Sequence, residues 1–459
     1  MKYHSTRGTG QYSFKDILFR GLAEDGGLFV PVSLPKFDIN KYDKTVNYND
    51  LAFDILSLFI GDDLSENDLR DIINDTYSDA FSSQNYVTYK NIDKSIIVEL
   101  FNGPTLAFKD FAMQLLIPMF DHFLKNEDKR VNLIVATSGD TGSAAINAVS
   151  KSNYVNIYCL YPKNRISDFQ RKQMSTIDKD NITLCEIDGT FDDCQNIVKS
   201  ILSDQNFCTS NSIAAVNSIN WARIAIQSVY YFYSYLKNNR DYNSKVNFSV
   251  PTGNFGDIYA GYVAKKLGLP IKKLVIATNE NDILYRFMQT GRYEKKKVVQ
   301  TTSPSMDIQI ASNFERLLFD LYDSSIPETK KKMLDFSEKG HFQVDEKILR
   351  LMKSSFEAHR ADQAEVGALI KKIYSSHGYL IDPHTAIGLA ASEKFKEDNL
   401  LNFVLSTAHP VKFSKSVEGY IGKKLNLLDD YKNLFSLKES FIALENDEMK
   451  LKELINSKN

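Results

Sequence analysis

In residues 131–151 the chain reads VNLIVATSGDTGSAAINAVSK. The first part, VNLIVAT, is a short apolar run with β-branched residues, which predicts a buried strand. The last part, SAAINAVSK, predicts a helix, and the loop SGDTG joins the two. Because a strand, a short loop and a helix in this order form half of a parallel βαβ unit, this stretch predicts an α/β fold.

The same alternation continues on both sides of this unit. The predicted strands are apolar on both faces, as is typical of parallel strands covered by helices. They are SIIVEL (95–100), VNIYCLYP (155–162), NITLCEID (181–188), KVNFSVP (245–251), KKLVIAT (272–278) and NLLNFVLST (399–407). Helices are predicted over 51–60, 63–78, 106–125, 166–177, 191–202 and 258–268. The alternation therefore predicts parallel βαβ units.

The length of 459 residues suggests two or three domains. We expect residues 1–95 to form an N-terminal cap region, and residues 96–215 a small α/β domain. A large α/β domain is expected from 216–291 together with 376–459. Residues 292–375 are richer in Lys, Ser and Glu and predict a mostly helical insertion.

Composition excludes several classes of function. Basic and acidic residues number 56 and 58, so the net charge of −2 gives no reason to expect nucleic acid or an anionic membrane as partner. The N-terminus lacks the apolar segment of a signal peptide, and no apolar run could span a bilayer. Cys159, Cys185, Cys194 and Cys208 form no CxxC pair and no metal-ligand cluster. We therefore expect a cytosolic protein with reduced thiols and without a metal site.

Three loops at predicted strand ends carry residues suited to chemistry, because ligands of open α/β sheets bind there. ATSGDTGSAA (136–145) could bind a carboxylate at a helix N-terminus, and PTGNFGD (251–257) could wrap a phosphate with main-chain N–H groups. LSTAHPVKF (405–413) places hydroxyls where they could contact a ring nitrogen. Taken singly, each loop is equally consistent with an ordinary turn or a capped strand end.

Lys109 lies in the apolar phrase GPTLAFKDF (103–111). Burial of a lysine disfavours the ammonium form, so its amine can form a Schiff base with an aldehyde. A lysine at a helix start could also simply extend to the surface. Such a lysine, a phosphate loop and a ring-nitrogen partner are together the parts that pyridoxal phosphate requires, which favours this cofactor.

The chain resembles the threonine synthase family, in its long bacterial and fungal type. The resemblance runs over nearly the full length, and it rests on motifs in the order of the family. These motifs are GLFVP (27–31), LSLFIGD (56–62), ELFNGPTLAFKDFAMQ (99–114), ATSGDTG (136–142), LYPKNRIS (160–167), NSINWAR (217–223), PTGNFGD (251–257), DPHTAIG (382–388) and LSTAHPVKF (405–413). The resemblance implies the fold type II architecture of pyridoxal-phosphate enzymes, with the cofactor between two open, mostly parallel α/β domains.

The resemblance also implies roles for individual residues. Lys109 corresponds to the lysine that bonds to the cofactor and acts as general base and acid, and Thr407 to the hydroxyl at the pyridine nitrogen. The cofactor phosphate is assigned to Gly253, Asn254, Phe255 and Gly256, with Thr252 and Asp257 at the edges. The substrate carboxylate is assigned to Ser138, Gly139, Asp140, Thr141 and Gly142. Many relatives in the wider superfamily have Asn where this chain has Asp140, so contact between Asp140 and the cofactor stays open.

The implied reaction converts O-phospho-L-homoserine and water to L-threonine and phosphate, the last step of threonine biosynthesis. The substrate carries its own phosphate, so a second anion site is needed. Lys163 and Arg165 are candidates, and NSINWAR is favoured because Asn220 and Arg223 share one helical turn. That motif contributes Asn217, Asn220 and Arg223, although Arg223 could equally form a structural ion pair. His384 and His409 are expected to be structural, since no catalytic triad pattern surrounds them.

Three other functions remain as alternatives. A non-catalytic relative could bind a phosphorylated ligand through the same loops, but it would not need Lys109. A phospho-lyase would share every motif and release 2-oxobutyrate instead of threonine. A serine or threonine dehydratase would have no second phosphate site. The sequence indicates no coiled coil or interface stripe, and we expect a monomer or a weak homo-oligomer.

Overall fold

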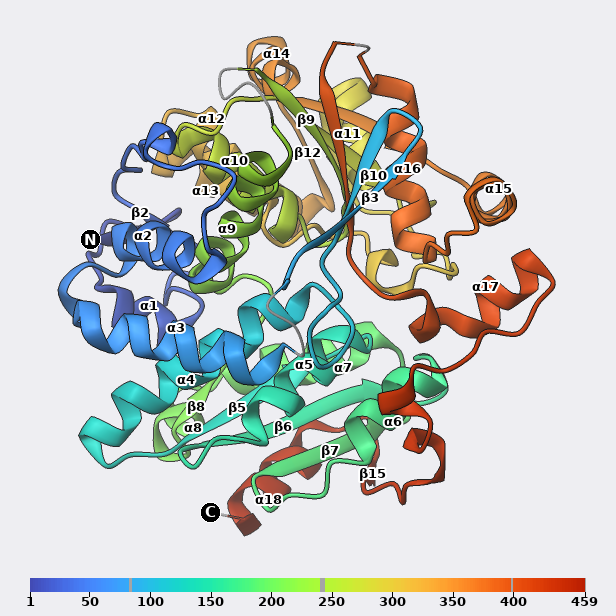
Figure 1. The fold of residues 1–459 in the computed structure, drawn as a ribbon. Helices are drawn as coiled ribbons and strands as arrows, with labels where there is room; N and C mark the ends of the chain where they lie inside the picture. The colour runs from blue at the N-terminus through green and yellow to red at the C-terminus, as the bar shows by residue number, and fades with distance from the viewer. Residues whose placement is uncertain (82–84, 240–243, 398, 459) are drawn as a thin grey trace.

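The computed structural model describes residues 1–81, 85–239, 244–397 and 399–458. Two sheets, one parallel and one mostly parallel, dominate the molecule with helices around them, one above the other in the view of Figure 1. Among the described residues, no helix combines the length and the apolar character needed to cross a membrane.

The larger sheet has six strands in the order β13-β10-β9-β14-β4-β3. Only β3 runs antiparallel to its neighbour; the other pairs are parallel. Alternate residues enter two different cores: Leu274 and Ile276 of β10 lie in one, Val275 and Ala277 in the other. The sheet is therefore covered on both faces, as its continuous apolar strands predict. Its strands are β3 (Thr88–Ile92), β4 (Ser95–Glu99), β9 (Val246–Pro251), β10 (Ile271–Thr278), β13 (Phe356–Arg360) and β14 (Leu401–Ser406).

Two groups of helices cover the larger sheet. α9 (Trp221–Asn238) and α10 (Gly256–Leu267) pack together, and α10 lies against β9 and β10. α16 (Pro383–Phe395) packs on β9, β10 and β14, and α15 (Gln363–His377) packs on α16 and on α17 (Ser414–Ile421).

The smaller sheet has five parallel strands in the order β15-β7-β6-β5-β8. The strands are β5 (Val131–Ala136), β6 (Val155–Pro162), β7 (Ile182–Ile187), β8 (Ile213–Ala214) and β15 (Ile442–Leu444). The helices around it are α4 (Lys109–Glu127), α5 (Asp140–Val149), α6 (Asp168–Ser175), α7 (Phe191–Ser203), α8 (Gln205–Ser210) and α18 (Glu448–Lys458). β5 and α5 are the strand and helix that residues 131–151 predict.

The N-terminal region packs against helices of both halves. Its α2 contacts α9 and α3, and α3 contacts α4. Its elements are β1 (Tyr3–Ser5), α1 (Phe14–Arg20), β2 (Phe29–Pro31), α2 (Tyr48–Ile60) and α3 (Glu66–Ala80). The predicted helices over 51–60 and 63–78 correspond to α2 and α3.

Sheet pairing differs from the predicted domain division in three places. β4 starts the predicted small domain but pairs with β14 in the larger sheet, and β15 of the predicted large domain pairs with β7 in the smaller one. The predicted insertion contains β13, which is the edge strand beside β10. Apolar runs indicate that a strand is buried but not which strand lies beside it, so the pattern could not assign these three. Asn459, the end of the predicted large domain, lies outside the described residues.

The rest of residues 292–375 is mostly helical. Its elements are β11 (Arg292–Glu294), α12 (Phe314–Leu321), α13 (Ile326–Lys339), β12 (His341–Gln343) and α14 (Glu346–Ser355), preceded by α11 (Ile283–Thr290). Short 3₁₀ turns include η3 (Pro304–Met306) and η4 (Pro410–Phe413), which both contribute to the site described next.

Candidate active site

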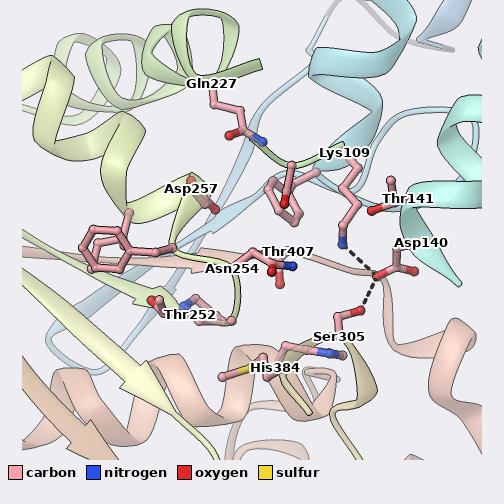
Figure 2. A pocket seen from close by; sticks show the side chains of 18 of the residues that line it. Lys109, Asp140, Thr141, Gln227, Thr252, Asn254, Asp257, Ser305, His384 and Thr407 are labelled. Carbon is pink, nitrogen blue, oxygen red and sulfur yellow. Dashed lines mark hydrogen bonds and ion pairs between the residues drawn. The ribbon is translucent and has the colours of Figure 1, made fainter. Parts of the chain in front are cut away.

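A pocket lies where the carboxyl ends of strands from both sheets face the first turns of α4, α5 and α10. Figure 2 shows Lys109, Asp140, Asp257 and Thr407 around one space, although they come from distant parts of the chain. Its lining comprises Phe108, Lys109, Asp140, Thr141, Ser218, Arg223, Gln227, Pro251, Thr252, Gly253, Asn254, Phe255, Gly256, Asp257, Ile258, Ser305, Met306, His384 and Thr407. This is the position where ligands bind in open α/β folds.

The segment before Lys109 is attached to the segment after β14. The N–H of Phe108 donates to the carbonyl of Thr407 at 2.9 Å, and the N–H of His409 donates to the carbonyl of Leu106 at 3.0 Å. Leu106 itself adopts a left-handed conformation with φ 60°. α4 then begins at Lys109, so these contacts fix the side chain of Lys109 beside Thr407.

Lys109 is 13% exposed and its charge is only partly balanced. Its Nζ lies 3.3 Å from Oδ2 of Asp140 and 4.7 Å from the centre of the Phe108 ring. Burial lowers the pKa of Lys109, the carboxylate of Asp140 raises it in part, and Arg223 and Lys412 lower it further. More of this lysine is therefore present as a free amine near neutral pH than of an ordinary lysine.

Asp140 is the carboxylate that links the site to the smaller sheet. Oδ2 contacts Lys109 and accepts from Ser305 at 3.2 Å, while Oδ1 accepts from Gln170 at 2.8 Å and lies 3.0 Å from Nζ of Lys412. Burial raises the pKa of Asp140, but Lys412 and Lys109 outweigh this and hold it well below its ordinary value. Asp140 is thus a buried anion at the N-terminus of α5.

The loop between β9 and α10 has the backbone of an anion site. Phe255 adopts a left-handed conformation with φ 63°, and α10 begins at the next residue, Gly256. A Cβ on Gly253 would come within 2.8 Å of the carbonyl of Ser305, so only glycine fits without movement. First-turn N–H groups of a helix lack partners within the helix and attract anions, above all phosphate.

Asp257, in the first turn of α10, is a carboxyl group of a different kind. Oδ1 accepts from the hydroxyls of Tyr230 at 2.6 Å and Tyr231 at 2.9 Å. Oδ2 has no hydrogen-bond partner among the residues described. Burial raises the pKa of Asp257 to about 6, although the two hydroxyls oppose this effect.

Arg223 is a buried cation that lines the pocket. It is 3% exposed; Nη1 donates to the carbonyl of Val216 at 3.2 Å, and Nε has no partner in the described part of the chain. Burial lowers its pKa to about 10. A buried guanidinium with a free nitrogen indicates a place for an anion. Within the described ranges Arg223 forms no ion pair, which is the structural alternative that the sequence left open.

Several predicted site residues do not line the pocket. Asn220 caps α9: its Oδ1 accepts from the N–H of Ala222 at 3.0 Å and its Nδ2 donates to the carbonyl of Leu18 at 2.8 Å. Because both ends of this amide are used inside the fold, we do not retain Asn220 as a substrate ligand. Ser138, Gly139, Gly142, Asn217, Lys163 and Arg165 are also absent from the lining.

Gly139 and Gly142 fix the conformation of the loop between β5 and α5 without lining the pocket. Their N–H groups both donate to Oγ1 of Thr137, at 2.9 and 2.8 Å. Gly139 has φ 125°, and a Cβ there would lie 2.4 Å from the side chain of Gln170. These glycines therefore bring Asp140 and Thr141, which do line the pocket, to its edge.

Some pocket residues carried no signal in the sequence. Ser305 and Met306 reach the site from η3, and Gln227 from α9, far along the chain from the three glycine or hydroxyl loops. Lys412 lies in the quoted motif LSTAHPVKF, but a lysine beside a proline has no distinctive pattern. Lys412 reaches Asp140 because β14, which precedes it, pairs with β4, a strand far away in sequence.

His384 and His409 differ from one another. Nδ1 of His384 lies 2.6 Å from Oδ2 of the fully buried Asp382, while Nε2 has no partner among described residues and the ring lines the pocket. His409 is absent from the lining; its Nδ1 accepts from the N–H of Val411 at 3.2 Å, and burial lowers its pKa to about 4. The expected structural role accounts for the contact of His384 with Asp382 but leaves Nε2 unused.

These observations fit a pyridoxal phosphate molecule. A lysine with a lowered pKa, the anion loop at α10 and the hydroxyl of Thr407 lie around one pocket, as that cofactor requires. Three lining residues, Arg223, Asp257 and His384, each have a buried polar atom without a partner in the described chain. In a native protein such atoms require an explanation, such as ordered water, a bound ion or polar ligand, or a catalytic role. Among the described residues, no cluster of His, Cys, Asp or Glu could hold a metal ion.

Comparison with protein-family models gives three matches along the chain. Residues 2–77 match the threonine synthase N terminus, and residues 385–455 match the threonine synthase C-terminal model. Residues 93–404 match the pyridoxal-phosphate dependent enzyme family, and this range contains every lining residue except Thr407.

Whole-chain relatives point the same way. The chain is 42% identical to threonine synthase of Pseudomonas aeruginosa, covering 99% of this chain and 98% of the relative, and 42% identical to that of Saccharomyces cerevisiae, covering 98% and 96%. A crystal structure of pyridoxal-phosphate-bound threonine synthase from Brucella melitensis superposes with a TM-score of 0.95 at 42% identity, covering 100% and 99% of the two chains. Maize serine racemase, at 12% identity and a TM-score of 0.51 over 74% of this chain and 92% of that one, shares the fold alone.

Proposed function

The chain belongs to the threonine synthase family of pyridoxal-phosphate enzymes, and we propose that it converts O-phospho-L-homoserine and water to L-threonine and phosphate. The observation that carries this proposal is the position of Lys109. Its amine faces a pocket that also holds an anion loop and the unpaired guanidinium of Arg223. Two phosphates, one on the cofactor and one on the substrate, require two such anion sites.

In this proposal the cofactor is held by Lys109, by the loop from Gly253 to Gly256, and by the hydroxyl of Thr407. Thr252 and Asp257 lie at the edges of the loop. When bound, pyridoxal phosphate supplies an aldehyde that captures amines and a ring that withdraws electrons from the carbon bearing the captured amine.

Lys109 moves protons during the proposed reaction. Its free amine can take a proton from Cα of the substrate, take one from Cβ as phosphate leaves Cγ, deliver one to Cγ to form the methyl group, and return one to Cα after water has added its hydroxyl at Cβ. Burial favours the amine, while Asp140 at 3.3 Å stabilises the ammonium that forms when a proton is taken up. The opposed effects let Lys109 act as both base and acid.

Two groups are proposed to bind the substrate itself. Arg223 is assigned to the substrate phosphate, with Asn217 as a neighbour on the same segment. The loop Ser138–Gly142 is assigned to the substrate carboxylate through the N–H groups of Asp140 and Thr141 at the start of α5, since those of Gly139 and Gly142 donate to Thr137. Asp140 is already paired with Lys109 and Lys412. Its negative charge is therefore balanced and repels the substrate carboxylate less.

Replacing Arg223 tests the assignment of the phosphate site. We expect Arg223→Gln to raise the KM for O-phospho-L-homoserine at least about tenfold, because a charged hydrogen bond is worth roughly 1.5–3 kcal/mol. Steady-state kinetics would check this, with Arg165→Gln as the control at a cation outside the pocket. An unchanged KM would move the substrate phosphate elsewhere.

One experiment separates the remaining functions. The purified chain is incubated with pyridoxal phosphate and O-phospho-L-homoserine, and threonine, 2-oxobutyrate and phosphate are measured together. Threonine equal to phosphate is the expected result. Phosphate equal to 2-oxobutyrate would indicate a phospho-lyase, and cofactor binding without phosphate release would indicate a binding protein. A serine or threonine dehydratase would act on the unphosphorylated amino acid, which serves as the second substrate in the assay.

We further propose a cytosolic location and a monomer or weak homo-oligomer. Four free thiols, three of them buried, suit a reducing compartment. Cell fractionation would test the location, and sedimentation at several concentrations would test the state of association.

A further inference from the structure

We propose that Lys412 is a positioning residue that pairs with Asp140 and so leaves the neighbouring Lys109 free to give up its proton. The proposal rests on the function assigned to Lys109 above, but it concerns the charge of that amine and is testable without turnover. None of the motifs quoted for the chain assigns Lys412 a role.

The position of Lys412 is unusual for a lysine. It is 0% exposed, and its Nζ donates to the carbonyl of Thr105 at 2.5 Å and lies 3.0 Å from Oδ1 of Asp140. It comes from η4, five residues after Thr407, in the segment that follows β14. A fully buried lysine is expected only where an anion compensates it, and Asp140 is that anion.

Asp140 therefore stands between two lysines, one on each carboxylate oxygen. If Asp140 had only Lys109 as partner, loss of a proton from Lys109 would leave a buried carboxylate without a counter-ion, which costs several kcal/mol. With Lys412 in place, the pair Asp140–Lys412 is neutral by itself. Lys109 can then alternate between amine and ammonium without leaving a buried charge unbalanced.

The other charged groups near Lys109 do not replace this effect. Arg223 acts on Lys109 in the same direction as Lys412 but has no ion-pair partner in the described chain. Asp257 lies on the opposite side, is paired with two tyrosine hydroxyls, and has its pKa raised to about 6. Near Lys412 itself, Asp110 accepts from the N–H and hydroxyl of Thr105, and His409 is a further titratable neighbour. Among the described residues, Lys412 is the only cation on Oδ1 of Asp140, which otherwise accepts from the neutral amide of Gln170.

Opposite effects of two substitutions on Lys109 test this inference. In the full chain freed of cofactor, cyanate labels uncharged amines, and the peptide containing Lys109 is quantified by mass spectrometry across pH. We expect Lys412→Met to slow labelling of Lys109 about tenfold at pH 8, because Asp140 then holds the ammonium form. We expect Asp140→Asn to accelerate it, and the double variant Lys412→Met, Asp140→Asn to return to at least the native rate.

Controls separate charge from packing. Lys412→Arg keeps the charge and is expected to preserve the pH profile, while Lys415→Met, at an exposed lysine on α17, is expected to change nothing. If Lys412→Met is folded and labels Lys109 as fast as the native chain, the inference is wrong. If Lys412→Met does not fold, the double variant decides: slow labelling there, with no carboxylate present, would also overturn it. Failure of threonine production would not affect these outcomes.

Discussion

Asp140 and Asp257 both lie in the first turn of a helix after a parallel strand, and both line the same pocket. Their surroundings differ. Asp140 has two lysines, and its pKa is held well below the ordinary value. Asp257 has two tyrosine hydroxyls, and burial raises its pKa to about 6. Both carboxyl groups lie at a helix N-terminus, so this feature does not explain the difference in pKa. The hydrogen-bond and ion-pair partners explain it: the lysines keep Asp140 ionised, whereas Asp257 has only hydroxyl partners.

The largest effect is expected from replacing Lys109, whose amine lies next to Asp140. Lys109→Ala removes the group proposed to move protons, so we expect phosphate release to fall about 10³-fold or more. Phosphate release under saturating substrate would check this, with Lys415→Ala as control. If the Lys109→Ala variant were active without added amine, Lys109 would not be the catalytic base, and the Asp140 side of the pocket would have no special role in proton transfer.

The next effect concerns stability at Asp140. Asp140→Asn leaves Lys109 and Lys412 without a charged partner, and we expect a loss of about 3 kcal/mol in unfolding free energy. The pKa of Asp140 in the folded protein is held below its ordinary value, so its contribution to stability is present above about pH 4 and is lost as the pH falls through the folded pKa. Urea unfolding at pH 7 would measure this loss, with the exposed Asp168→Asn as control. No loss would mean that the lysines do not depend on this carboxylate.

A smaller effect is expected at the loop beside Asp257. The Cβ of Gly253→Ala would press on the carbonyl of Ser305, and we expect cofactor affinity to fall about tenfold as the loop shifts. Titration of the cofactor by its absorbance would measure this. Gly419→Ala, where a Cβ meets open space, is the matched control. Unchanged affinity would place the cofactor phosphate away from this loop.

The smallest effect is expected at Asp257. Its contribution to stability depends on pH in the opposite direction to that of Asp140, because its pKa is raised instead of lowered. The folded pKa of Asp257 is raised to about 6 from 3.8, so its contribution to stability is present below pH 3.8 and is lost as the pH rises through 6. We expect Asp257→Asn to be about 1 kcal/mol more stable than the native chain at pH 8 and no more stable at pH 4, since its own unpaired amide limits the gain. Thermal unfolding of the cofactor-free chain at both pH values would check this. A stability loss at pH 8 would show that Asp257 is needed as an anion.

Local patterns predict much of this molecule. β5 and α5 follow from residues 131–151, and the lysine and three loops that the sequence singles out supply residues that line one pocket. What local patterns do not contain is pairing between distant segments. The neighbours of β4, β13 and β15, the capping role of Asn220 and the burial of Lys412 all depend on parts of the chain far away in sequence. These features are therefore the ones that differed from expectation or were missed.

The pairing of β14 with β4 has a consequence for the protein during its synthesis. Phe108, the residue before Lys109, is hydrogen-bonded to Thr407, and Lys412, which pairs with Asp140, follows Thr407 by five residues. Neither contact can form until these late residues have left the ribosome. β7 likewise cannot pair along one edge until β15 has been synthesised. Until then the edges of β4 and β9 that face β14, and the edge of β7 that faces β15, stay unpaired and open to wrong association. A nascent chain of this protein therefore completes its catalytic centre among its last folding events, and shielding by chaperones would matter most in that interval.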